Sequence, residues 1–306
     1  MVTLLFLLAT LAAQAGPAPR FEAAQPLTTW KTAMAGASIS AQGSTFEMAG
    51  GTGWTRTTNV YLDYRFSVDF QLASSDAEGA VYVRAGQDRR NSLPNVGYRV
   101  AIRTNGTTPD WAGRITAQSS RLSVITPGSQ RTPLDQQWHS MDVDVVGDRV
   151  TVRVDGTLVS EAEGAELGAG HIGLEHRTGL LRFRNPTIAL LRERTWEATR
   201  GTAGGTPESP GIMSGTAGVV RPTLLSDPKP RYSADTLLAR VQGTVYLDVV
   251  IDETGRVAQT VVTRSVDPDL DLEARAAARR WRFRPATQNG RPVAFRATFA
   301  LDFTPR

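Results

Sequence analysis

The stretch Leu62-Asp63-Tyr64-Arg65-Phe66-Ser67-Val68-Asp69-Phe70-Gln71-Leu72 places an apolar or aromatic residue at every second position. Successive side chains of a β-strand point to opposite faces, so this alternation predicts a strand with one face in a core. The same pattern recurs at 81–84, 99–103, 141–145, 150–154, 172–174, 181–183 and 188–190. Gly147-Asp148 and Asp155-Gly156 supply hairpin turns. Residues 25–192 are therefore predicted to form a β-sandwich of two antiparallel sheets.

A second architecture is predicted after residues 193–217, whose Gly, Thr, Pro and Ser content indicates a flexible linker. Alternation returns at 245–251, 256–264 and 293–303, and Asp267-Pro268 suits the start of a helix. One apolar stripe of that helix comprises Leu270, Ala274, Ala277 and Trp281. The prediction is a small α+β domain over 218–306, with a three-stranded sheet and one helix. Because the linker has little apolar material to pack, we expect the two domains to unfold independently.

Composition excludes several classes of function. The 306-residue chain has a formal net charge of +4, which gives no electrostatic case for nucleic-acid binding. Its only lysines, Lys31 and Lys229, do not lie in a Walker-type phosphate loop. With no cysteine there is no disulfide, cysteine nucleophile or thiolate metal site. The three histidines lack zinc-ligand spacing, so we expect neither a metal nor a cofactor.

Residues 1–15 are predicted to be a secretory signal peptide. They run apolar from Leu4 through Ala13 and end in Ala13-Gln14-Ala15, the small-x-small pattern that signal peptidase cleaves. A bilayer span needs about 20 apolar residues, more than this segment contains. The mature protein is therefore expected outside the cytoplasm, with membrane attachment only if the segment stays uncleaved as a short anchor.

The C-terminal segment resembles the C-terminal domains of TonB-type proteins. The motifs WRFRPA (281–286) and NGRPV (289–293) carry the resemblance, with GTVYLDVVID (243–252) before them. It covers about residues 218–304, although Ser233 stands where the family usually has proline. The resemblance implies a periplasmic domain that grips an extended peptide of an envelope or outer-membrane protein by strand addition. It further implies that the last strand is at a sheet edge, with the outward-facing side chains Arg296, Thr298 and Ala300.

The sandwich resembles the 3-keto-disaccharide hydrolase family of concanavalin A-like folds. The motifs GAVYVR (79–84), GYRVAI (97–102) and GHIGLE (170–175) occur in that family's order. The family usually carries glutamate and glutamine on the strand after Gly-Tyr, where this chain has Arg99 and Ala101. Without that glutamate the position has no carboxylate for acid–base work. If the sandwich is catalytic, the candidate residues are Glu175 and His176.

Several polar residues allow two interpretations. Tyr82, Arg84, Arg99 and Arg103 can line a face for a hydroxylated or anionic ligand, and an ordinary outward face gives the same alternation. Asp142 and Asp144 can be a carboxylate pair or part of a solvated outer face. The arginines of the helix, Arg275, Arg279 and Arg280, are predicted to lie on a solvated face beside Asp271 and Glu273.

The leading hypothesis is a periplasmic two-domain binding protein and not an enzyme. Its TonB-type domain docks an envelope protein by strand addition, and its lectin-like sandwich holds a glycan or acts as a spacer. One alternative is a hydrolase of 3-keto-glycosides. Another is a TonB-like energy transducer for outer-membrane transport, which needs a membrane anchor. The last alternative is a purely structural scaffold.

Overall fold

The computed structural model describes residues 19–86, 92–103, 112–117, 124–127, 134–165, 168–191, 212–213, 218–232 and 234–305. The predicted signal peptide and nearly all of the predicted linker lie outside these residues. In the described parts of the chain, no helix has both the length and the apolar character needed to cross a membrane.

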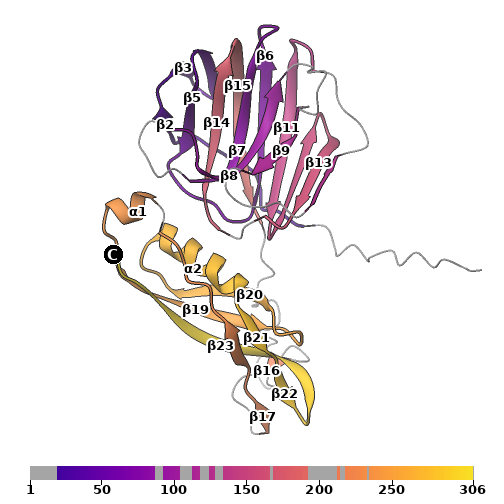
Figure 1. Cartoon of the computed structure of the whole chain (residues 1–306), viewed down its shortest axis with the longest axis vertical. Coiled ribbons are helices and arrows are strands. Elements are labelled where there is room, and N and C mark those ends of the chain that lie inside the picture. The colour runs from indigo at the N-terminus through magenta and orange to yellow at the C-terminus, as the bar shows by residue number, and fades with distance from the viewer. Residues whose placement is uncertain are drawn as a thin grey trace, which may run out of the picture.

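The N-terminal part consists of two antiparallel sheets (Figure 1). The large sheet has the order β10 (Val124–Pro127), β13 (Thr157–Glu163), β12 (Arg149–Val154), β11 (Trp138–Val146), β6 (Tyr64–Leu72), β15 (Leu180–Leu190), β4 (Thr45–Gly50), β3 (Ala37–Gln42), with β1 (Gln25–Pro26) beside β15. The small sheet has the order β2 (Trp30–Met34), β5 (Gly53–Thr57), β14 (His171–Thr178), β7 (Glu78–Gly86), β8 (Val96–Arg103), β9 (Ile115–Ala117). The predicted sandwich is thus confirmed.

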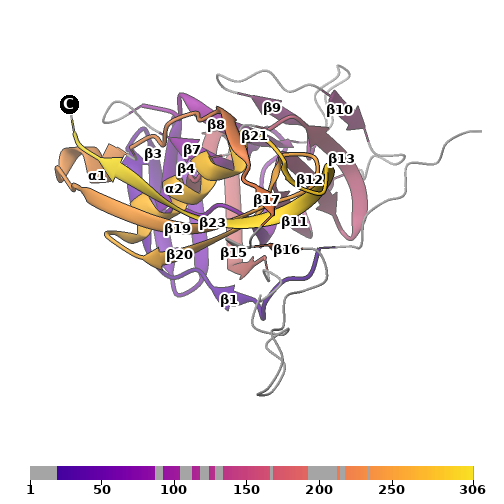
Figure 2. The ribbon, with the colours of Figure 1, turned by 90° about the horizontal axis from the view of Figure 1, so that it is seen from below.

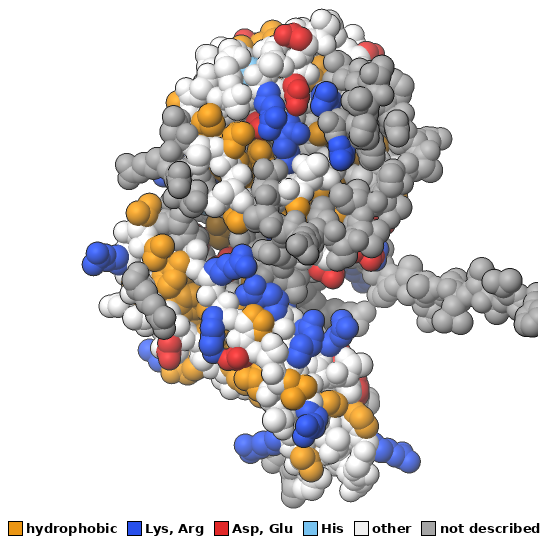
Figure 3. Space-filling view, viewed as in Figure 1, with side chains coloured by type: hydrophobic (Ala, Val, Ile, Leu, Met, Phe, Trp, Pro, Cys, Tyr) orange, Lys and Arg blue, Asp and Glu red, His pale blue; other side chains and the backbone are white. Residues whose placement is uncertain are grey.

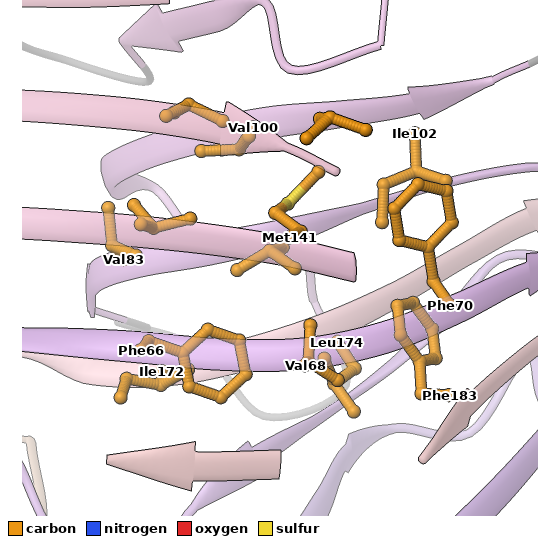
Figure 4. Packing of buried hydrophobic residues seen from close by; sticks show 14 of the residues in the cluster. Phe66, Val68, Phe70, Val83, Val100, Ile102, Met141, Ile172, Leu174 and Phe183 are labelled. Carbon is orange, nitrogen blue, oxygen red and sulfur yellow. The ribbon is translucent and has the colours of Figure 1, made fainter. Parts of the chain in front are cut away.

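The core fills the space between the sheets (Figure 4). Strand β6 alternates strictly between buried and half-buried residues, as its sequence predicts. Phe66, Val68 and Phe70 of the large sheet face Val100 and Ile102 of the small one (Figure 4). Burial of such side chains contributes about 1.5–3 kcal/mol each, so these two inner faces hold the sandwich together.

The C-terminal part is a small α+β domain, as predicted. Its sheet has the order β17 (Val219–Val220), β22 (Ala286–Gln288), β23 (Arg291–Phe303), β19 (Gly243–Ile251), β20 (Val257–Arg264). The sheet therefore has more strands than the three predicted, because the sequence analysis missed β17, β22 and β16 (Ile212–Met213), which pairs with β23. It also missed β18 (Thr223–Ser226), β21 (Arg282–Arg284) and α1 (Ala234–Leu238).

Helix α2 (Pro268–Arg280) begins where the sequence predicts. The Asp267 carboxylate caps it by accepting from the backbone N–H groups of Asp269 and Leu270, at 2.9 and 3.4 Å. The predicted apolar stripe packs on the sheet in one cluster with Val245, Leu247, Leu301 and Phe303. The cap and the stripe together explain why the helix forms here and which face it buries.

The two domains touch, contrary to the expectation that only a linker joins them. Helix α2 lies between its own sheet and the sandwich (Figures 1 and 2). The Arg279 guanidinium donates to the Asp63 carboxylate of the sandwich, so the predicted solvated helix face is wrong at this residue. The sequence argument looked for an apolar surface in the linker, whereas the contact is made by charged residues of the helix.

Candidate functional site

One edge of the C-terminal sheet is open along β23. From Phe295 to Phe303 every residue is in register with β19, with Thr298 opposite Asp248. On the other side, β16 runs parallel to Ala294 and Phe295. Among the described residues, no strand pairs with that side from 296 to 303. Backbone N–H and C=O groups that face outward there can accept an added strand.

Side chains anchor this edge strand from both faces. On one face, Phe299 packs against Trp281, with ring centroids 5.0 Å apart. On the other, Thr298 Oγ1 donates to Asp248 Oδ1 at 2.6 Å, and Arg296 donates to the second oxygen of that carboxylate. Ala300 is exposed. Of the three predicted edge residues, two are thus joined through Asp248, which the sequence analysis did not single out.

A charged cluster lies on the outer face of the small sheet, at Glu175 of β14. Arg99 Nε donates to Glu175 Oε2 at 2.6 Å, and Arg177 Nε donates to Oε1 at 2.9 Å. The hydroxyl of Tyr82 lies 3.5 Å from the same Oε1. Arg99 also reaches Glu78, at 3.5 Å. Figure 3 shows basic and acidic side chains gathered over this sheet, which faces the viewer.

Much of this cluster is closed to solvent. Glu175 and Tyr82 have no exposed surface, whereas the Arg177 side chain is 40% exposed. Tyr82 packs edge-on against Trp54, and the Trp54 indole donates to the Ser92 carbonyl at 2.8 Å. Burial and the nearby Glu175 charge raise the pKa of Tyr82 to about 12. A ligand on this face therefore meets guanidinium groups and not an open aromatic ring.

The other two predicted ligand residues lie elsewhere. Arg84 has a φ of 51° and follows a register shift in β7, so its side chain turns away from Tyr82. It is buried at the base of the sandwich, where it donates to the Gly147 carbonyl at 2.7 Å. Arg103 is in register with Glu78 on the neighbouring strand, four pairs along from Arg99 and Tyr82.

The two weak catalytic candidates point to opposite sides of β14. His176 is buried, with Nδ1 2.9 Å from the Gly51 carbonyl oxygen and Nε2 2.9 Å from that of Gly179. Glu175 is on the other face with its two arginines. The structure therefore does not bring this carboxylate and this imidazole together. In the parts of the chain that the structure describes, no group of three or more His, Cys, Asp or Glu residues could hold a metal ion.

The pair Asp142 and Asp144 belongs to the outer face of the large sheet. Asp144 accepts from Arg65 at 2.5 and 2.8 Å and from Arg153 at 3.1 Å. Asp142 accepts from Ser67 at 2.5 Å. These cross-strand contacts support the interpretation of an ordinary polar outer face.

Comparison with known proteins finds a family match in each of the two domains. The model of the 3-keto-alpha-glucoside-1,2-lyase-like domain matches residues 21–189. The chain belongs to this family. Residues 228–305 match the model of the Gram-negative bacterial TonB protein C-terminal. Both resemblances expected from the sequence are thus confirmed.

The TonB similarity extends to individual proteins. The chain is 39% identical over 75 residues to Protein TonB of Xanthomonas campestris pv. campestris, which covers 24% of this chain and 34% of that protein. It is 32% identical over 100 residues to Protein TonB of Vibrio cholerae, covering 32% of this chain and 41% of that protein. The chain thus spans about a third to two fifths of the relatives it matches.

Several solved structures are similar to part of this chain. The carbohydrate-binding module CBM66 from Bacillus subtilis is 16% identical, with 52% of this chain and 94% of that chain covered and a TM-score of 0.39. The exoplasmic/lumenal domain of VIP36 in a Ca²⁺/Man-bound form is 15% identical, covering 56% and 86%, with a TM-score of 0.41. Bacillus licheniformis β-glucanase is 11% identical, covering 58% and 100%, with a TM-score of 0.37.

Proposed function

We propose that this protein is a two-domain binding protein of the bacterial envelope, whose C-terminal domain adds a partner peptide to β23. The observation that carries the proposal is the side of β23 without a paired strand between residues 296 and 303. Strand addition needs an edge that stays extended before the peptide arrives. The packing of Phe299 on Trp281 and the hydrogen bond from Thr298 to Asp248 hold β23 in this extended conformation.

The position of β16 limits the part of the β23 edge to which a peptide can add. Ile212 and Met213 already pair with Ala294 and Phe295, so the first part of the edge is taken by the chain itself. A partner peptide adds along residues 296–303, or it displaces β16. The partner is a peptide segment of an envelope or outer-membrane protein, in keeping with the TonB-type domain, and the location is periplasmic.

Variants of Thr298 test this mode of binding. Proline at Thr298 removes a backbone donor, and if that N–H faces outward it abolishes peptide binding. Thr298→Ala removes only the hydroxyl, which already bonds Asp248, and is expected to change affinity less than threefold. Binding of the intact protein to an array of random decapeptides measures both. Equal loss in both variants, with the circular dichroism spectrum unchanged, would mean that side chains and not the backbone carry recognition.

The sandwich is proposed to hold a hydroxylated or anionic glycan on the outer face of the small sheet. The exposed Arg177 guanidinium and the partly exposed Glu78 are the groups that such a ligand can reach. Guanidinium groups bind carboxylates and sugar hydroxyls through paired N–H donors. A glycan array that includes uronate-containing sugars tests this, and an empty array would leave the sandwich as a spacer.

Catalysis on 3-keto-glycosides is the second candidate, and membership of the lyase-like family favours it. The geometry supports it less, because Glu175, the one strand carboxylate that is completely buried on this face among the described residues, accepts hydrogen bonds from two arginines. Turnover of a 3-keto-glucoside by the purified protein would establish this activity. Sequencing of the mature N-terminus addresses the third candidate, an energy transducer, because residues 1–15 must then remain attached.

A further inference from the structure

Helix α2 has a second buried face, which its own sheet does not cover. Ala276 is fully buried but is not part of the cluster that joins the helix to the sheet. Glu273, one turn before it, is 6% exposed, and the Arg279 side chain, one turn after it, is 19% exposed. Residues three apart lie on the same side of a helix, so these three define one outer face. Within the C-terminal domain, only the segment around Arg231 is shown beside this face among the described residues, where its backbone N–H lowers the pKa of Glu273.

On the sandwich, the outer face of α2 meets a carboxylate that is already held in place. Asp63 Oδ1 accepts from the backbone N–H of Gly147 at 3.0 Å and lies 3.4 Å from Arg84 Nη2. Arg84 itself donates to the carbonyls of Leu62 and Gly147, at 3.1 and 2.7 Å. The second oxygen, Oδ2, receives Arg279 from the helix. One oxygen of Asp63 therefore bonds to groups of the sandwich, and the other bonds to the helix.

The backbone next to Asp63 is closely packed at Gly170. Gly170 exchanges hydrogen bonds with Tyr61 at 2.9 and 3.0 Å, and a Cβ at Gly170 would come within 2.3 Å of the Arg84 backbone. The preceding residue, Ala169, lies close enough to Glu273 of α2 for its backbone N–H to lower the pKa of that carboxyl. The base of the sandwich thus presents a donor for Glu273 and an acceptor for Arg279, in the order in which the helix displays them.

We propose that the base of the sandwich, formed by Asp63, Gly147 and Ala169–Gly170, is a specific docking site for the outer face of α2. The partner is the TonB-type domain of the same chain, and the two domains form one rigid unit. Buried ion pairs add little net stability because desolvation offsets their attraction, but a misplaced partner leaves a charge buried and unpaired. Such contacts select one docked orientation over the others. The open edge of β23 and the charged face of the small sheet are consequently held at a fixed distance and angle.

Distances measured in the intact protein test the docking. The chain has no cysteine, so Asp148→Cys and Glu253→Cys introduce one spin label on an exposed turn of each domain. Electron–electron double resonance should give one narrow distance population. Arg279→Glu places a carboxylate against Asp63 and is expected to broaden it to several times its original width. Arg284→Gln removes an exposed guanidinium and should leave it unchanged.

A second variant approaches the contact from the sandwich. Asp63→Asn removes the charge that receives Arg279 and is also expected to broaden the distribution, while near-ultraviolet circular dichroism reports whether the sandwich remains folded. A broad distribution in the labelled parent would overturn the proposal. So would a narrow distribution that persists in folded Arg279→Glu.

Discussion

Two buried glutamates, Glu175 on the small sheet and Glu273 on α2, are held in different ways. Two arginines donate to Glu175 at 2.6 and 2.9 Å, so guanidinium groups in direct contact neutralise it. Around Glu273, the backbone N–H groups of Arg231 and Ala169 and the charges of Arg280 and Arg231 all act to lower the pKa of the carboxyl. Burial raises the pKa of Glu273 to about 7, and these interactions lower it only in part.

The comparison shows that burial alone does not set the role of a carboxylate. An opposite charge in contact favours the ionised form of a buried carboxyl, whereas burial itself favours the protonated form. Glu175 holds two arginines through direct hydrogen bonds. Glu273 acts as an acceptor whose charge depends on pH.

The largest effect is expected from Glu175→Gln. The amide keeps the shape but leaves the Arg99 side chain, 11% exposed, with only the more distant Glu78 carboxylate, at 3.5 Å, as an opposing charge among the described residues. Breaking a buried pair from one side costs about 3–5 kcal/mol of unfolding free energy. Urea unfolding followed by Trp fluorescence measures the loss. A change below about 1 kcal/mol would mean that this pair is solvated like a surface one.

A smaller effect, dependent on pH, is expected at Glu273. Its folded pKa of about 7 lies above the ordinary value of 4.5, so between these values the folded state binds the proton that the unfolded state has released. Stability contributed by this group is full below pH 4.5 and is lost as the pH rises to 7, by about 2–4 kcal/mol in total.

The matched variant for this titration is Glu273→Gln, which removes the ionising group and keeps a side-chain acceptor. The difference in unfolding free energy between parent and variant should fall between pH 5 and pH 7 and become constant above pH 8. If the unfolding free energies of parent and variant change in parallel with pH, the Glu273 carboxyl is solvated and the contrast with Glu175 is lost.

The smallest effects are expected where arginines reach water. Arg177→Gln removes one donor to Glu175, but 40% of its side chain is exposed, so the loss is about 0.5–1 kcal/mol. Arg149 pairs with Glu161 at 2.9 Å on the outer face of the large sheet and is 55% exposed. Arg149→Gln should therefore change stability by no more than about 0.5 kcal/mol. Thermal unfolding of both variants measures the two losses of stability. A larger loss in Arg149→Gln than in Arg177→Gln would contradict the role of exposure.

The elements of the fold that depend on local pattern were predictable. Alternation identified β6 and its buried face, and Asp267 with the following proline marked the start of α2. What covers a face was not predictable. Period-two alternation shows which side chains share a face, but nothing in it indicates that Trp54 and Tyr82 are sealed or that α2 is buried on two sides.

The placement of the candidate site residues was predictable in part, and their roles stay predictions. Tyr82 and Arg99 were placed on one face, and the structure joins them through Glu175. Arg84 was placed with them because regular alternation was assumed, whereas its positive φ and the register shift of β7 turn it toward Asp63. A left-handed residue inside a strand leaves little trace in sequence when it is not glycine.

The one-sided pairing of β23 has a consequence for the rates at which its amide hydrogens exchange with solvent. In an antiparallel pair, neighbouring amides point alternately toward the partner strand and away from it. Between residues 296 and 303, amides bonded to β19 are released only when the sheet opens, whereas those directed outward meet water directly. Exchange along this strand therefore alternates between slow and fast with a period of two residues. A bound peptide would remove the fast set and leave the slow set as it was.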